Sequence, residues 1–152
     1  MDELCPVLLL DTNVVLDWLA FGDAAIVPIA EAVASGRVRL ISSAACIDEL
    51  QRALGYKAIK LDAAAQARAL GTYRGRADLR DAPPEGSLPM LPRCEDRDDQ
   101  KFLELAWHAH ALWLVSRDKA LLKLAPKLAR MGRFAVIPPA AFSAALQALP
   151  AA

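Results

Sequence analysis

The chain has 152 residues, 55% of them hydrophobic, which is enough to bury the core of one domain of common size. Its 18 basic and 18 acidic residues balance, so no global positive field indicates a nucleic-acid-binding protein and no acidic tail indicates disorder. Three cysteines without close paired spacing argue against a disulfide framework or a zinc ribbon, and we expect a cytoplasmic protein.

The two ends of the sequence lack the patterns of export signals and membrane spans. Residues 1–4 carry acid where a secretory signal would carry basic residues, and the apolar run that follows stops at Asp11. The apolar stretch from Phe134 to Pro150 is interrupted by prolines and polar residues, so it lacks the roughly 20 apolar residues of a membrane span. We therefore expect no membrane association.

The first half of the chain alternates between strand and helix patterns. Val7 to Leu10 is a continuous aliphatic run, typical of a strand covered on both faces, and helical spacing begins just after Asp11. The other elements predicted in this half are a helix over Ala24 to Ala34, a strand over Val38 to Ile41, a helix capped by Ser42 or Ser43, and a helix over Leu61 to Tyr73.

The second half begins with a proline-rich segment, Asp81 to Pro92, which predicts a loop with a brief strand at Met90 and Leu91. The elements predicted after it are a helix from Asp96 or Asp98 to about His110, a strand over Leu112 to Val115, a helix over Ala120 to Met131, a strand over Phe134 to Ile137, and a helix from Pro138. This alternation predicts an α/β fold, a three-layer α/β/α sandwich with a mainly parallel central sheet. No internal repeat interrupts the chain, so we expect a single domain over residues 1–152.

Four acidic residues lie near the ends of apolar segments. Asp11 and Asp118 each follow a predicted strand, and ligands gather at the carboxyl ends of strands in an open parallel sheet. On a helical wheel Glu49 lies roughly 100° from the centre of its apolar stripe, whereas Asp48 lies roughly 160° away and should face solvent. Asp99 lies roughly 70° from the centre of the stripe on its own helix, so it can also reach a site beside the core.

Taken singly, each acid has a purely structural explanation. Asp11 and Asp118 could cap the helices that follow them, and an isolated Glu49 would more often be a solvated helix residue. The acids from Asp96 to Asp99 could simply favour a helix N-terminus. The joint pattern is harder to explain in this way, because converging carboxylates form a site for the hard divalent cations that promote phosphodiester hydrolysis.

Several motifs in a fixed order resemble the PIN-domain family. They are Leu8-Leu9-Leu10-Asp11-Thr12-Asn13, Glu49 in a capped helix, the acidic run that begins at Cys94 and continues through Asp99-Gln100-Lys101-Phe102-Leu103-Glu104-Leu105-Ala106, and Leu114-Val115-Ser116-Arg117-Asp118-Lys119. The resemblance covers nearly the whole chain. It is greatest to the bacterial group of toxin components in toxin-antitoxin pairs, which are related to the VapC-type ribonucleases.

This resemblance implies a metal-dependent ribonuclease that cleaves single-stranded or structured RNA and uses Mg²⁺ or Mn²⁺. The family's four acids, which are both catalytic and metal-binding, correspond by position to Asp11, Glu49, Asp99 and Asp118. The polar positions that orient the ligands or a bound water correspond to Thr12, Asn13 and Ser116, and Asp96 is a further supporting acid. The resemblance also implies an antitoxin partner and a homodimer.

Some features leave alternatives open. Asp96 or Asp98 could replace Asp99 as the principal ligand of the acidic cluster. Arg117 stands where the family often has a small or amide residue, and Ala120 stands where a second acid often follows. These departures motivate a second hypothesis, a non-catalytic PIN-fold module that binds RNA or regulates. A phosphatase of the haloacid dehalogenase type is disfavoured, because Asn13 occupies the position of that family's second aspartate.

Overall fold

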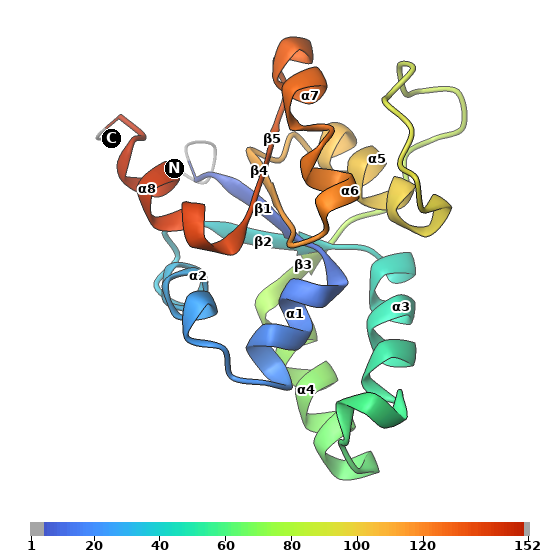
Figure 1. Ribbon diagram of the computed structural model, residues 1–152, viewed down its shortest axis with the longest axis vertical. Helices are drawn as coiled ribbons and strands as arrows, with labels where there is room; N and C mark the ends of the chain where they lie inside the picture. Colours follow the sequence, from blue (N-terminus) through green and yellow to red (C-terminus); the bar gives the residue numbers. More distant parts are fainter. Residues whose placement is uncertain (1–4, 151–152) are drawn as a thin grey trace.

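The computed structural model describes residues 5–150, which form a five-stranded parallel sheet in the order β3-β2-β1-β4-β5. The strands are β1 (Val7–Leu10), β2 (Arg39–Ser42), β3 (Ala77–Leu79), β4 (Trp113–Val115) and β5 (Ala135–Ile137). Helices cover both faces of this sheet (Figure 1). The predicted three-layer α/β/α sandwich is therefore confirmed, whereas the residues 1–4 that argued against an export signal lie outside the described residues.

The helices fall into two groups, one on each face of the sheet (Figure 1). The first face carries α1 (Thr12–Leu19), α2 (Val27–Ala34), α3 (Ala44–Leu54), α4 (Ala63–Arg76) and α8 (Phe142–Gln147). The second face carries α5 (Gln100–His108), α6 (Lys119–Leu122) and α7 (Ala125–Met131). Short 3-10 helices precede or connect several of these elements, namely η2 (Ala24–Ile26), η3 (Lys57–Ile59), η4 (Arg97–Asp99) and η5 (Pro139–Ala141).

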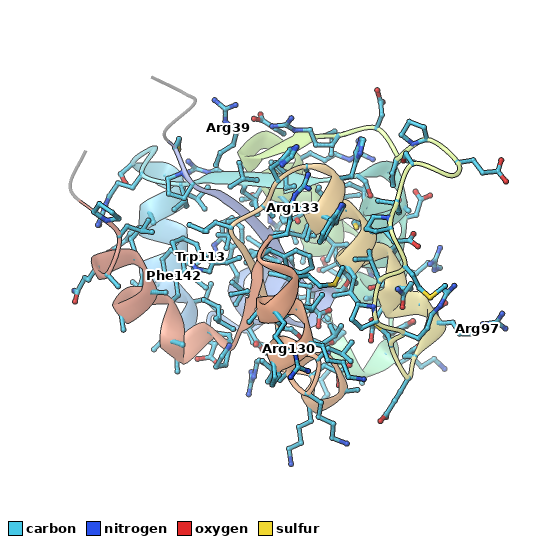
Figure 2. All side chains as sticks on the ribbon, turned by 90° about the horizontal axis from the view of Figure 1, so that it is seen from above. Arg39, Arg97, Trp113, Arg130, Arg133 and Phe142 are labelled. Atoms are coloured by element: carbon cyan, nitrogen blue, oxygen red, sulfur yellow. The ribbon has the colours of Figure 1, made fainter. Side chains whose placement is uncertain are left out.

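Strand β1 is buried on both faces, as its aliphatic run predicts. Leu8 and Leu10 belong to the core under the first group of helices, and Leu9 belongs to the core under the second. This division follows from the pleat of a strand, which directs successive side chains to opposite faces. On the first face, Trp113 of β4 also packs edge-on against Phe142 of α8, with their ring centroids 5.6 Å apart (Figure 2).

The register of the parallel strands determines which residues meet at the carboxyl edge of the sheet. Leu10 pairs with Val115, so Asp11 and Ser116 are the first residues beyond that pair. The backbone hydrogen bonds of the sheet extend to these two residues. The Asp11 amide donates to the Val115 carbonyl at 3.0 Å, and the Ser116 amide donates to the Ile137 carbonyl at 3.0 Å. Regular backbone pairing therefore places both residues side by side.

Two predicted elements differ from the structure, and one strand in the structure was not predicted. The strand predicted at Met90 and Leu91 is wrong, because the flanking prolines cannot donate to a ladder and only Leu91 is anchored in the core, while Met90 is 94% exposed. Strand β3 was not predicted; it is a short edge strand with an exposed Asp78 and no apolar run. The helix predicted over Ala120 to Met131 is divided into α6 and α7, since Pro126 favours a new helix N-terminus.

No single helix among residues 5–150 is long and apolar enough to cross a membrane. The bent pair Thr12–Leu19 and Ala24–Ala34 passes the same test when both parts are joined, by length and composition only. The three cysteines, one buried and two half-buried, are all free thiols. The cytoplasmic location stays a prediction.

Candidate active site

Asp11 is the most buried of the four candidate acids, with an exposed fraction of 3%. It follows β1 and caps α1, where one carboxylate oxygen accepts a hydrogen bond from the Asn13 amide at 3.4 Å. The other oxygen accepts from the Ser116 hydroxyl at 2.6 Å, and this hydroxyl is itself fully buried. The capping explanation therefore holds for Asp11, but its second oxygen points to the neighbouring strand and is held there.

Ser116 also connects Asp11 to Asp118. Its hydroxyl oxygen accepts a hydrogen bond from the Asp118 amide at 3.0 Å while its hydroxyl group donates to Asp11. Asp118 then caps α6, with one carboxylate oxygen accepting from the Ala120 amide at 2.9 Å. One serine side chain thus fixes the backbone that carries Asp118 relative to the carboxylate of Asp11.

Asp99 approaches the same edge from a different segment, at the junction of η4 and α5, and is half-buried. Burial raises the pKa of Asp99 to about 7, with further contributions from the charge of Asp11 and a hydrogen bond with the Asp118 side chain. Burial also raises the pKa of Asp11 against the opposing hydrogen bond from Ser116, and the charges of Glu49 and Asp118 add to this rise. Asp11 and Asp99 are therefore close enough to the neighbouring acids for their charged forms to be disfavoured.

Glu49 faces this cluster from α3 and is half-buried, whereas Asp48 is exposed, as the helical wheel predicts for both. One carboxylate oxygen of Glu49 accepts a hydrogen bond from the Thr12 hydroxyl at the start of α1. The other oxygen accepts from the Lys101 ammonium at 2.5 Å. Thr12 is thus a supporting residue of Glu49, while Lys101 is a contact that the sequence did not indicate.

The remaining candidates lie at the rim. Asn13 is exposed and touches Asp11 through its backbone amide. Asp96 is exposed and caps η4, since its carboxylate accepts from the Asp98 amide at 2.9 Å. Asp98 is exposed as well. Of the acids between positions 96 and 99, only Asp99 is half-buried beside Asp118, so it is the best placed of the three for a ligand role.

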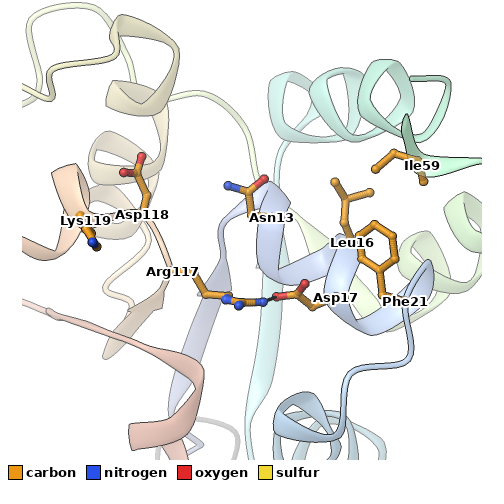
Figure 3. A pocket seen from close by; sticks show the side chains of 8 residues that line it. All are labelled: Asn13, Leu16, Asp17, Phe21, Ile59, Arg117, Asp118 and Lys119. Carbon is orange, nitrogen blue, oxygen red and sulfur yellow. Dashed lines mark hydrogen bonds and ion pairs between the residues drawn. The ribbon is translucent and has the colours of Figure 1, made fainter. Parts of the chain in front are cut away.

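A cavity of about 710 Å³ is lined by Asp118, one of the four candidate acids (Figure 3). One wall is apolar and contains Leu16, Ile59 and Phe21, whose side chain is 56% exposed. The opposite wall carries Asp118 and Lys119. The remaining lining residues are Asn13, Asp17 and Arg117. The acidic cluster therefore borders a space that has both an apolar surface and positive charge.

The oxygen-rich donor set suits Mg²⁺ or Mn²⁺, because hard cations prefer carboxylates to histidine or thiolate. Within residues 5–150, however, no three histidine, cysteine or acidic side chains already surround a common point as metal ligands would. Two hydrogen bonds help to explain why the carboxylates do not surround a common point. The Asp11 carboxylate is turned toward Ser116, and the Glu49 carboxylate is turned toward Lys101. The residue types fit a divalent cation, and binding it would require these side chains to turn away from their present partners.

Residues 7–120 match the PIN-domain family. The chain belongs to the PIN-domain family. This family consists generally of nucleases, and its members generally use divalent metal ions. The matched residues include all four candidate acids, Asp11, Glu49, Asp99 and Asp118.

A solved structure has a similar fold, the VapBC2 from Rickettsia felis bound to a DNA fragment from their promoter. Its TM-score is 0.59, and the alignment covers 87% of this PIN domain and 98% of that chain at 14% sequence identity. At this identity the likeness concerns the fold. No curated protein matches the chain.

Arg117, which departs from the usual PIN-domain pattern, has a clear structural role here. Its guanidinium lies 2.6 Å from Asp17 and 3.6 Å from Asp23, and it joins the end of β4 to α1 and η2 (Figure 3). Asp17 is buried, so the ion pair compensates a charge that would otherwise be costly inside the protein. A signal for this pair was present in the sequence, because Asp17 interrupts an apolar stretch of α1.

Proposed function

We propose that this PIN domain is a metal-dependent ribonuclease that hydrolyses the phosphodiester bonds of RNA, with Mg²⁺ or Mn²⁺ as its cofactor. The observation that carries the proposal is that Asp11, Asp99 and Asp118 lie together at the carboxyl edge of the sheet, where burial, the charge of Asp11 and a hydrogen bond with Asp118 raise the pKa of Asp99 to about 7. Glu49 lies beside them on α3. The proposed catalytic domain spans residues 1–152.

Asp11, Asp99 and Asp118 would hold the cation, and Glu49 completes the acidic quartet. A bound divalent cation neutralises the charge that develops on the phosphate and lowers the pKa of a coordinated water. The residues around the quartet position it for this task. Ser116 fixes one oxygen of Asp11, the amide of Asn13 holds the other, and Thr12 fixes Glu49.

The cavity beside the acids supports a single-stranded substrate. Exposed Phe21 offers an aromatic face on which an unpaired base can stack, and stacking of this kind is typical of single-strand binding. Lys119 on the opposite wall is exposed and follows Asp118 directly, so it is available for a phosphate of the same strand. A double helix keeps its bases stacked and would not present one to this cavity.

We further propose that the protein is the toxin of a toxin-antitoxin pair, with an antitoxin as its partner, and that it forms a homodimer. The similar fold of VapBC2 from Rickettsia felis supports the toxin role and the antitoxin partner. A small open reading frame directly upstream of the gene would support the pair. Its absence would leave the proposed nuclease chemistry untouched.

The cofactor requirement tests the proposal directly. Cleavage of a labelled single-stranded RNA should fall to background when EDTA is added in excess, and it should return when Mg²⁺ or Mn²⁺ is restored. The same RNA without protein, with and without Mg²⁺ or Mn²⁺, controls for hydrolysis by the cation alone. Cleavage that persists in EDTA would overturn the metal requirement. RNA binding without any cleavage in Mg²⁺ and Mn²⁺ would favour the non-catalytic module instead.

A further inference from the structure

Lys101 brings a positive charge into the acidic site. It lies two residues after Asp99 in the first turn of α5, and its ammonium contacts the Glu49 carboxylate at 2.5 Å. The same ammonium donates to the Asp98 carbonyl at 2.6 Å and lies 5.0 Å from the centre of the Phe102 ring. Three contacts therefore hold the Lys101 side chain in place.

The contact with Lys101 distinguishes Glu49 from the other three acids. Both carboxylate oxygens of Glu49 are engaged, one by Lys101 and the other by Thr12. In contrast, within residues 5–150 no lysine or arginine contacts Asp11, Asp99 or Asp118, which agrees with the raised pKa of Asp99 and of Asp11. The unbalanced negative charge is thus on the three aspartates.

We propose that this PIN domain holds one divalent ion on Asp11, Asp99 and Asp118, and that Lys101 is a positioning residue that prevents Glu49 from binding a second ion. The inference rests on the proposed function and refines the role of Glu49 in it. A second cation at Glu49 would have to displace the ammonium and then remain beside its positive charge. The side chains of Lys101 and Glu49 are 25% and 20% exposed, so solvent screens this repulsion only in part.

The arrangement also gives Lys101 a role toward the substrate. An ammonium group has three N–H donors, and two are used by Glu49 and the Asp98 carbonyl within residues 5–150. The third is left for a phosphate oxygen of RNA. Lys101 would thus provide a fixed positive charge on the Glu49 side of the site, in place of the charge that a second ion would supply.

Counting the bound ions tests this inference without any measurement of cleavage. We would titrate the metal-free full chain with Mn²⁺ alone and measure the number of bound ions by calorimetry and by electron paramagnetic resonance. The wild type should bind one Mn²⁺. The Lys101→Met variant keeps the length of the side chain but loses its charge, and it should bind two. Lys101→Arg keeps the charge and should still bind one.

Two further variants test whether the second Mn²⁺ ion binds at Glu49. Lys119→Met removes a positive charge next to Asp118 but not from Glu49, so it should bind one ion like the wild type. Adding Glu49→Gln to Lys101→Met should return the count from two to one. Two ions in the wild type, or one ion in a folded Lys101→Met variant, would overturn the inference while leaving the metal requirement intact. No Mn²⁺ binding by any variant would instead overturn the proposed function.

Discussion

Substitution of Asp11 by Asn is expected to lower the rate of RNA cleavage at saturating Mg²⁺ by about a thousandfold or more. Asp11 contributes a carboxylate to the proposed cation site and is held by Ser116 at 2.6 Å. An amide is a weaker ligand for a hard cation than a carboxylate and carries no charge to balance it. The rate of cleavage of a labelled single-stranded RNA, measured over a range of Mg²⁺ concentrations, gives the effect.

The fold of this variant should remain intact, because Asn has nearly the same shape as Asp and can still accept from Ser116. Burial raises the pKa of Asp11, so the folded protein disfavours its charged form, and loss of that charge should not lower the free energy of unfolding. Asp48→Asn is the matched control, an exposed acid on α3 that should cleave within twofold of wild type. A folded Asp11→Asn variant with cleavage within tenfold of wild type would contradict the proposed site.

Mn²⁺ affinity is expected to rise about tenfold per pH unit between pH 5 and 6.5 and to level off above pH 7. The reason is that the pKa of Asp99 is raised to about 7, so the ion must displace one proton at lower pH. Calorimetric titrations at several pH values, in buffers of different ionisation enthalpy, would give both the affinity and the number of protons released. A pH-independent affinity across this range would contradict a role for Asp99, with its raised pKa, as a ligand of the ion.

The raised pKa of Asp99 also predicts how the stability of the metal-free protein depends on pH. The pKa of Asp99 is about 7 in the folded protein and near 3.8 in the unfolded chain, so the folded state binds more protons between these values. The free energy of unfolding should therefore fall as pH rises from about 4 to 7. In Asp99→Asn this contribution should vanish, with a gain of about 1–2 kcal/mol at pH 7.5 after allowing for solvent screening. Urea denaturation of both proteins at pH 5 and pH 7.5 would measure it.

The elements and residues that could be predicted from the sequence are those whose burial follows a regular period. The aliphatic run of β1 predicts a strand covered on both faces, and the structure places Leu8 and Leu9 in opposite cores. The wheel of α3 separates half-buried Glu49 from exposed Asp48, because a turn of helix fixes directions relative to the apolar stripe. The carboxyl edge of a parallel sheet brings Asp11 beside the end of β4.

Other features depend on contacts between distant segments, which one sequence does not reveal. Lys101 looks like an ordinary solvated lysine near a helix N-terminus, and only the packing of α3 against α5 brings Glu49 to it. Asp17 interrupts an apolar stretch of the sequence, but only the structure shows that Arg117 is its partner. Strand β3 owes its conformation to pairing with β2 at the sheet edge, not to its own side chains.

The proposed cation site is tested most sharply by a crystal structure of the protein soaked with Mn²⁺, with the ion located by its anomalous scattering. We expect a peak within about 2.5 Å of one carboxylate oxygen from each of Asp11, Asp99 and Asp118, at the carboxyl edge of the sheet. The Asp11 and Asp99 side chains should move toward the ion relative to the metal-free arrangement. A peak elsewhere on the protein, or no peak among these three carboxylates at millimolar Mn²⁺, would contradict the proposed cation site.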